Sequence, residues 1–134
     1  MINDIAKSVK DQFDNDATLA AALSGLYFQR APQAVTFDYG IFYINNITQD
    51  EIMGSGTAND ITKIDIQFSL FTNDKDGGYK MAALLEKLRN AYHWQTMSVT
   101  DYTFMKMQQV TVLPIVYEDE VWQVSADYEM WITT

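Results

Sequence analysis

The sequence predicts an α+β fold, a two-layer sandwich in which helices pack on an antiparallel or mixed four-stranded sheet. Apolar residues recur at three- and four-residue spacing in residues 2–12 and 76–92, as in amphipathic helices. They alternate with polar residues in 61–71 and 122–132, as in half-buried strands. Helices and strands with these apolar sides pack as two layers, one of helices and one sheet.

The chain has the length of one domain. We expect a single α+β domain over residues 1–134, with an N-terminal helical extension over 1–15. Cysteine is absent, which excludes disulfides and thiolate metal sites. No apolar run approaches the roughly 20 residues of a membrane span, so we expect a soluble, intracellular product without membrane contact.

Two helices are predicted first. The initial one covers residues 2–12 and places Ile5 and Val9 on one face. Residues 14–16 are short acidic or amide side chains that end this helix and cap the next, which runs to Ser24. Gly25 is the predicted helix breaker.

A strand and a loop follow Pro32. The segment 35–45 alternates between two apolar faces, with Tyr39, Ile41 and Tyr43 on one and Phe42 and Ile44 on the other. Residues 46–60 contain a Gly-Ser-Gly sequence and several turn formers, and they are predicted to be a long loop.

The second half continues with a strand over 61–71 and a helix over 76–92. An apolar stripe marks the buried side of that helix, and we expect Leu85→Asp to unfold the domain; the stripe comprises Met81, Leu84, Leu85, Leu88 and Tyr92. Residues 93–109 show no clear period and are left unassigned. The segments 110–117 and 122–132 then form a hairpin whose turn is Glu118, Asp119 and Glu120.

No constellation of catalytic, cofactor-binding or metal-ligating residues is visible. His93 is the one histidine, and a structural role is expected for it at the end of its helix. Asp74 and Asp76 before a glycine pair are better explained by helix capping than by a calcium loop, because no bidentate Glu follows at the required offset. We therefore expect no enzyme activity, no cofactor and no metal.

The formal net charge is −9, and after Lys106 the chain has five acidic residues and no basic one. Nucleic-acid affinity depends mostly on Lys and Arg displacing counterions, so tight nucleic-acid binding is not expected. Solubility alone is the plainer explanation of an acidic chain.

Some large apolar side chains lack an obvious place in a monomer. Trp131 lies on the polar face of its strand, and the strand 35–45 is apolar on both faces. Such surfaces are commonly hidden against another subunit, although helices on both sheet faces would also hide them. The predicted subunit interface comprises Phe42, Ile44, Ile52, Met53 and Trp131.

The order of elements resembles that of the tail completion (tail terminator) proteins of long-tailed bacteriophages. Local features that carry the resemblance are Arg30-Ala31-Pro32 before the first strand, a strand running into Asn73-Asp74 and a glycine-bearing helix start, and a last strand rich in aromatics. The similarity spans about residue 17 to the end.

The resemblance implies a homo-oligomeric, hexameric ring that caps the tail tube, stops its growth and docks the head connector protein. It implies a virion protein that is assembled in the host cytoplasm and that contacts the tail tube protein. The acidic residues that would face the lumen or the docking surface are Asp50, Glu51, Glu118, Asp119 and Glu120. An intracellular binding module that holds a small ligand on an aromatic sheet face is the alternative.

Overall fold

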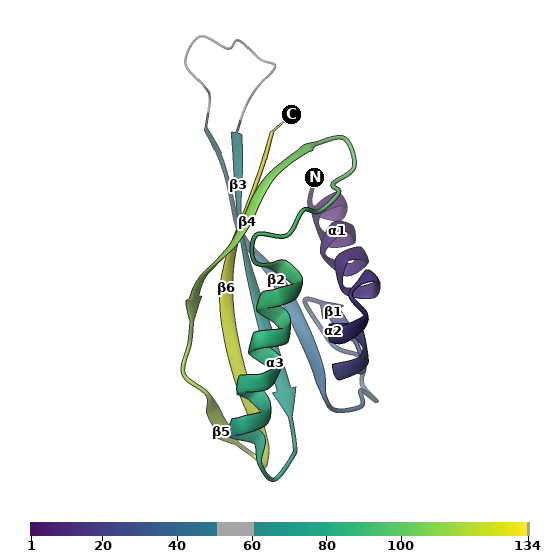
Figure 1. The fold of residues 1–134 in the computed structure, drawn as a ribbon, viewed down its shortest axis with the longest axis vertical. Helices are drawn as coiled ribbons and strands as arrows, with labels where there is room; N and C mark the ends of the chain where they lie inside the picture. The colour runs from purple at the N-terminus through teal and green to yellow at the C-terminus, as the bar shows by residue number, and fades with distance from the viewer. Residues whose placement is uncertain (51–60, 134) are drawn as a thin grey trace.

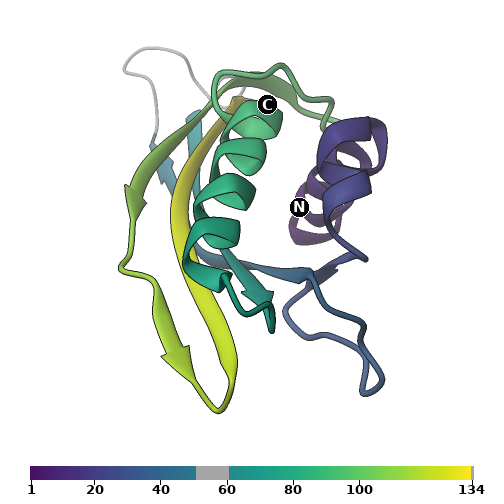
Figure 2. The ribbon, with the colours of Figure 1, turned by 60° about the horizontal axis from the view of Figure 1, so that its bottom comes forward.

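The computed structural model describes residues 1–50 and 61–133. The fold is α+β, with three helices packed on one face of a six-stranded sheet (Figures 1 and 2). The elements in chain order are α1 (Ile2–Asn15), α2 (Ala17–Ala22), β1 (Leu26–Phe28), β2 (Tyr39–Asp50), β3 (Ile61–Thr72), α3 (Gly77–Tyr92), β4 (Thr103–Val112), β5 (Val116–Glu118) and β6 (Val121–Thr133).

The sheet is mixed. Its strand order is β1-β2-β3-β6-β4, and β5 pairs with β6 beyond the end of β4. β1 runs parallel to β2, whereas every other neighbouring pair is antiparallel. β3 and β6 form the centre and pair from Ile61–Thr133 to Thr72–Trp122 without a register shift.

The prediction of four strands was wrong, because residues 1–50 and 61–133 form six. β1 has only three residues, too few for an alternation to be detected. The predicted strand 110–117 is divided into the end of β4 and β5 by the segment 113–115, where Pro114 cannot donate to a neighbouring strand. β4 begins at Thr103, within the segment left unassigned, and register shifts at Phe104/Lys106 and Gln109/Thr111 blur its alternation.

β2 also differs from its prediction. It begins at Tyr39 rather than Val35 and continues to Asp50, so residues 46–50 are strand and not loop. They are held there by pairing with Ile61–Asp65 of β3. The remainder of the predicted loop, 51–60, lies outside the described residues.

The covered face of the sheet, the one that faces the helices, forms the core with them. An aromatic cluster lies at its centre, where the ring of Phe68 is 4.8 Å from that of Tyr92 and 5.2 Å from that of Tyr128 between centroids. Ile5 and Val9 of α1 are fully buried, so the predicted N-terminal extension contributes to this core. The covered face is otherwise lined by Ile64, Ile66, Leu70, Val124, Ala126, Met130 and Ile132.

The helix predictions hold in outline. The side chain of Asp16 accepts a hydrogen bond from the amide of Leu19 at 2.9 Å, so it caps α2 as predicted, although this helix ends at Ala22. On α3 the stripe is shifted, because Leu88 is fully buried whereas Leu85 is half-buried. Leu88 is therefore the more severe site for a polar substitution.

The start of α3 is held differently from its prediction. The side chain of Asp76 makes no capping hydrogen bond to the helix. Instead Asp74 accepts from the amide of Asp76 at 2.9 Å, and the ammonium of Lys80 lies 2.8 Å from the carboxylate of Asp38. Because Asp38 precedes β2, this ion pair ties the first turn of α3 to the sheet.

Two buried tyrosines give a matched test of the core. The hydroxyl of Tyr92 donates to the carbonyl of Val9 at 2.7 Å and joins α3 to α1, whereas the hydroxyl of Tyr128 has no hydrogen-bond partner among the described residues. We expect Tyr92→Phe to lower the free energy of unfolding by about 0.5–1.5 kcal/mol, because the buried hydrogen bond that joins α3 to α1 is lost. Tyr128→Phe should be neutral or stabilising. Urea unfolding of both variants measures this, and equal losses would contradict it.

Candidate functional site

The sheet ends on one side in an exposed apolar strand. We call residues 110–117 the edge segment; it comprises the end of β4, the link 113–115 and most of β5. All eight residues are exposed, and six of them are large and apolar. Their exposed fractions run from 38% to 56%; they are Val110, Val112, Leu113, Ile115, Val116 and Tyr117. Exposed apolar edges of this kind are sites of association, because the strand offers both backbone partners and apolar area.

The edge segment leads into an acidic tip. Glu118 pairs with Val121, and Asp119 and Glu120 between them have positive φ angles of 51° and 64°. Two central residues with positive φ match the twist of a two-residue hairpin, so the predicted tight turn is confirmed. All three acidic side chains of the tip are exposed, and no ion pair joins them to another described residue. The tip is therefore a concentrated negative charge beside an apolar edge.

The other end of the β4 edge is already occupied. The amide of Trp94 donates to the carbonyl of Met107 at 2.8 Å, and the amide of Gln109 donates to Nδ1 of His93 at 2.9 Å. These bonds hold the end of α3 against β4. The edge segment begins directly beyond these two bonds, so the whole of β4 is not open to another strand. His93 has the structural role that the sequence predicts.

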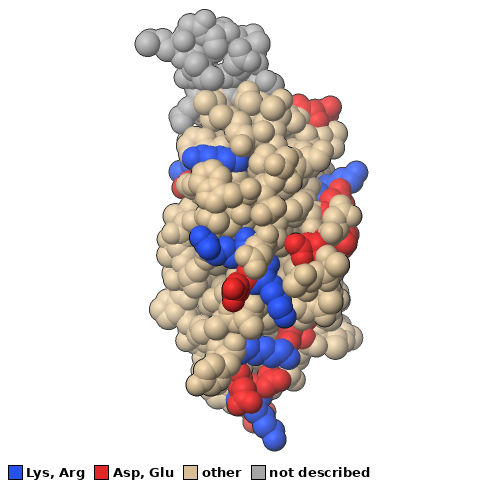
Figure 3. All heavy atoms as spheres, viewed as in Figure 1, with Lys and Arg blue, Asp and Glu red and all other residues tan. Residues whose placement is uncertain are grey.

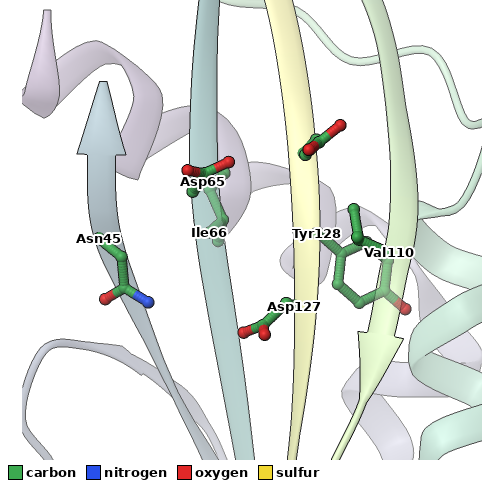
Figure 4. Close-up of a pocket in the computed structure, with 7 residues that line it drawn as sticks. Asn45, Asp65, Ile66, Val110, Asp127 and Tyr128 are labelled. Carbon is green, nitrogen blue, oxygen red and sulfur yellow. The ribbon is translucent and has the colours of Figure 1, made fainter. Parts of the chain in front are cut away.

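The open face of the sheet, the one turned away from the helices, has a charged centre (Figure 4). Asp65 of β3 and Asp127 of β6 line a hollow of about 280 Å³, with Asn45 and Val110 at its sides. Burial, and then the nearby charge of Asp65, raise the pKa of the Asp127 carboxyl. Lys63 lies 3.6 Å from Glu129 and 4.0 Å from Asp65, so part of this negative charge is balanced.

Trp131 is also on the open face. It is half-buried, and the ammonium of Lys106 lies 5.1 Å from the centre of its ring and 5.8 Å from that of Trp94. Cation–π contact of this kind covers part of the ring within the subunit. The exposed area of the Trp131 side chain is therefore smaller than its place on the polar face of the strand predicts.

The remaining predicted interface residues lie elsewhere. The structure places Phe42 in the core, 1% exposed and stacked on Phe28 with 5.1 Å between centroids, so the prediction that it faces another subunit is wrong. Its strand turns that face inward because Phe42 pairs with the buried Phe68. Ile44 is half-buried on the same face, packed against the core. Ile52 and Met53 lie outside the described residues.

The predicted acidic residues are only partly brought together. Glu118, Asp119 and Glu120 form the tip, whereas Asp50 ends β2 and Glu51 lies outside the described residues. Among residues 1–50 and 61–133, no group of three or more His, Asp or Glu side chains is placed to hold a metal ion. None of the helices described is long and apolar enough to cross a bilayer.

Sequence reasoning missed two surfaces. Tyr39 and Phe71 stack on the open face with 4.8 Å between their ring centroids. The edge segment is predicted only as one arm of a hairpin, and its exposure on both sides is not foreseen. A signal was present, since Val110, Val112 and Val116 alternate with Leu113, Ile115 and Tyr117, and a strand apolar on both sides needs cover on both.

Comparison with known proteins identifies the fold. No known protein family matches the chain, and no curated protein matches it in sequence. A chain of the solved structure described as the virion of a native gene transfer agent (GTA) particle aligns with a TM-score of 0.76 at 13% identity, covering 96% of this chain and 93% of that chain. A second solved chain, described only by an identifier, covers 97% and 95% at a TM-score of 0.58 and 13% identity.

The hydrogen bond to His93 predicts a pH dependence. Burial first, and then the charge of Arg89, lower the pKa of His93 from its usual 6.5, so the folded protein prefers the neutral ring. The unfolded chain therefore binds a proton at higher pH than the folded one, and stability declines as pH falls below about 6.5. The effect is small because water screens a half-exposed ring.

The matched variant is His93→Asn, whose side-chain oxygen replaces Nδ1 as acceptor and does not titrate. Urea unfolding at about pH 8 and about pH 5 should show a smaller loss of stability for this variant than for the original chain. The same loss in both proteins would show that His93 does not carry this dependence.

Proposed function

We propose that this chain is a structural protein of a phage or phage-like particle, and within it a ring-forming tail terminator, or tail completion, subunit at the head–tail junction. The observation that carries the proposal is the fold similarity over nearly the whole of both chains to a component of a gene transfer agent virion. The element order of the sequence, which resembles the tail completion proteins, supports the narrower role.

Physical features of the surface suit this role. The exposed apolar edge segment offers a surface for assembly rather than for catalysis. A net charge of −9 and the acidic tip disfavour the adhesion of DNA, which has to pass through such a ring. On the side shown in Figure 3, basic and acidic side chains are interleaved, without the broad basic patch that nucleic-acid binding needs. The proposed role is structural and not enzymatic.

The proposed partners follow from the position at the junction. One surface of a homo-oligomeric ring, hexameric by the resemblance, contacts the last layer of the tail tube protein and prevents addition of another. The opposite surface docks the head connector protein. We propose that the acidic residues Asp50, Glu51, Glu118, Asp119 and Glu120 face the lumen or one of these partners. The protein then belongs to the virion and is assembled in the host cytoplasm.

A small-ligand binding module remains the alternative. A hollow of about 290 Å³ on the open face is lined by the stacked pair Tyr39 and Phe71, by Val116 and Val121, and by the polar residues Glu118, Asp119 and Gln123. The aromatic and aliphatic walls suit the apolar part of a ligand, and the two carboxylates suit a cationic group on it.

Size-exclusion chromatography with light scattering, followed by electron microscopy, separates the two functions. The terminator predicts closed rings of the mass of a hexamer, and these rings should shorten the tubes formed by the tube protein of the same particle. A protein that remains monomeric up to roughly millimolar concentration, and that melts at higher temperature with an apolar ligand, would favour the binding module.

A further inference from the structure

The two outer edges of the sheet, β1 on one side and β4 with β5 on the other, have different side chains, and this difference suggests how copies of the chain join. At one end are the edge segment and the acidic tip. At the other end is β1, followed by the segment 29–38 that leads to β2. We call these the acidic end and the basic end. We propose that the acidic end of one subunit packs against the basic end of the next, head to tail. This inference rests on the proposed ring.

The acidic end needs apolar cover. Its six large apolar side chains remain 38–56% exposed after the domain has folded, and they follow one another along a single strand edge. Pro114 and the register shifts of β4 interrupt the ladder, so side-chain packing rather than one continuous added strand is the contact that fits. The basic end offers partly buried apolar partners, Tyr27 and Phe28 on β1 and Phe37 before β2.

The charges favour a head-to-tail contact between subunits over a two-fold contact between two acidic ends. The acidic tip has three carboxylates without an ion pair among the described residues. The basic end has two charged residues: Asp38, which is paired with Lys80 at 2.8 Å, and Arg30, which is exposed and forms no ion pair among the described residues. A two-fold contact between two acidic ends would bring six carboxylates together, whereas a head-to-tail contact brings them to Arg30.

The positions of the two ends agree with this contact. In both ribbon views β5 and the segment between β1 and β2 lie at the same lower end of the molecule and on opposite sides of it (Figures 1 and 2). A neighbour displaced sideways therefore brings one against the other without a shift along the long axis. Contacts between unlike surfaces repeat from subunit to subunit, and they form a ring when the rotation closes.

Charge reversal tests the contact. Glu118→Lys/Glu120→Lys and Arg30→Glu should each weaken assembly by about tenfold or more, measured as the concentration at half-assembly by light scattering. Combining the three substitutions should restore assembly, because the charges are opposite again. Glu86→Lys and Arg89→Glu reverse exposed charges on α3 and are the controls that should leave assembly unchanged.

A second variant tests the apolar part. Val116→Lys places a charge on an exposed position, so the monomer should keep its melting temperature while assembly is lost. Two results would overturn this contact and leave the proposed function standing. In the first, rings form and none of these substitutions weakens them. In the second, each charge variant weakens the rings and the combined variant does not restore them. A chain that never assembles would overturn both.

Discussion

The pairing of β3 with β6 is the constraint on which the rest of the structure depends. The two strands run antiparallel over their full lengths, and each has another strand on its other side. One face of the pair is apolar from Ile64 to Leu70 on β3 and from Val124 to Ile132 on β6, and it is closed by α3 and α1 around Phe68, Tyr92 and Tyr128. A one-residue slip between them would move every core side chain to the open face, so the register is strongly fixed.

That central pairing determines which surfaces are left for other molecules. Because β3 and β6 are hydrogen-bonded on both sides, backbone groups remain accessible at the outer strands of the sheet. The end of α3 already occupies part of the β4 edge through His93 and Trp94. The edge segment is the apolar part of what remains, and its composition is the reason for proposing it as a surface for protein contact. The open face is mixed: paired charges and a partly covered tryptophan lie on it, together with the stacked rings of Tyr39 and Phe71.

Much of this fold could be predicted from the sequence, because strong periodicity survives in the long elements. One regular apolar stripe is buried on each of the long elements β3, β6, α1 and α3, and the acidic turn between two apolar runs predicts the hairpin. Prediction failed where tertiary pairing overrides local pattern. Residues 46–50 are rich in turn formers but are held as strand by β3, and β1 is too short to show any period. Phe42 could not be assigned to the core because its strand is apolar on both faces until β3 fixes which one turns inward.

Hydrogen exchange of backbone amides, followed by mass spectrometry at low and high protein concentration, tests most directly whether the edge segment is an assembly surface. In the dilute subunit the amides of residues 110–117 that do not bond to β6 should exchange rapidly, whereas those of β3 should be strongly protected. At concentrations where the chain assembles, protection should appear in 110–117 and next to Arg30, and β3 should remain unchanged. Assembly that leaves exchange in both of these segments unaltered would contradict the account.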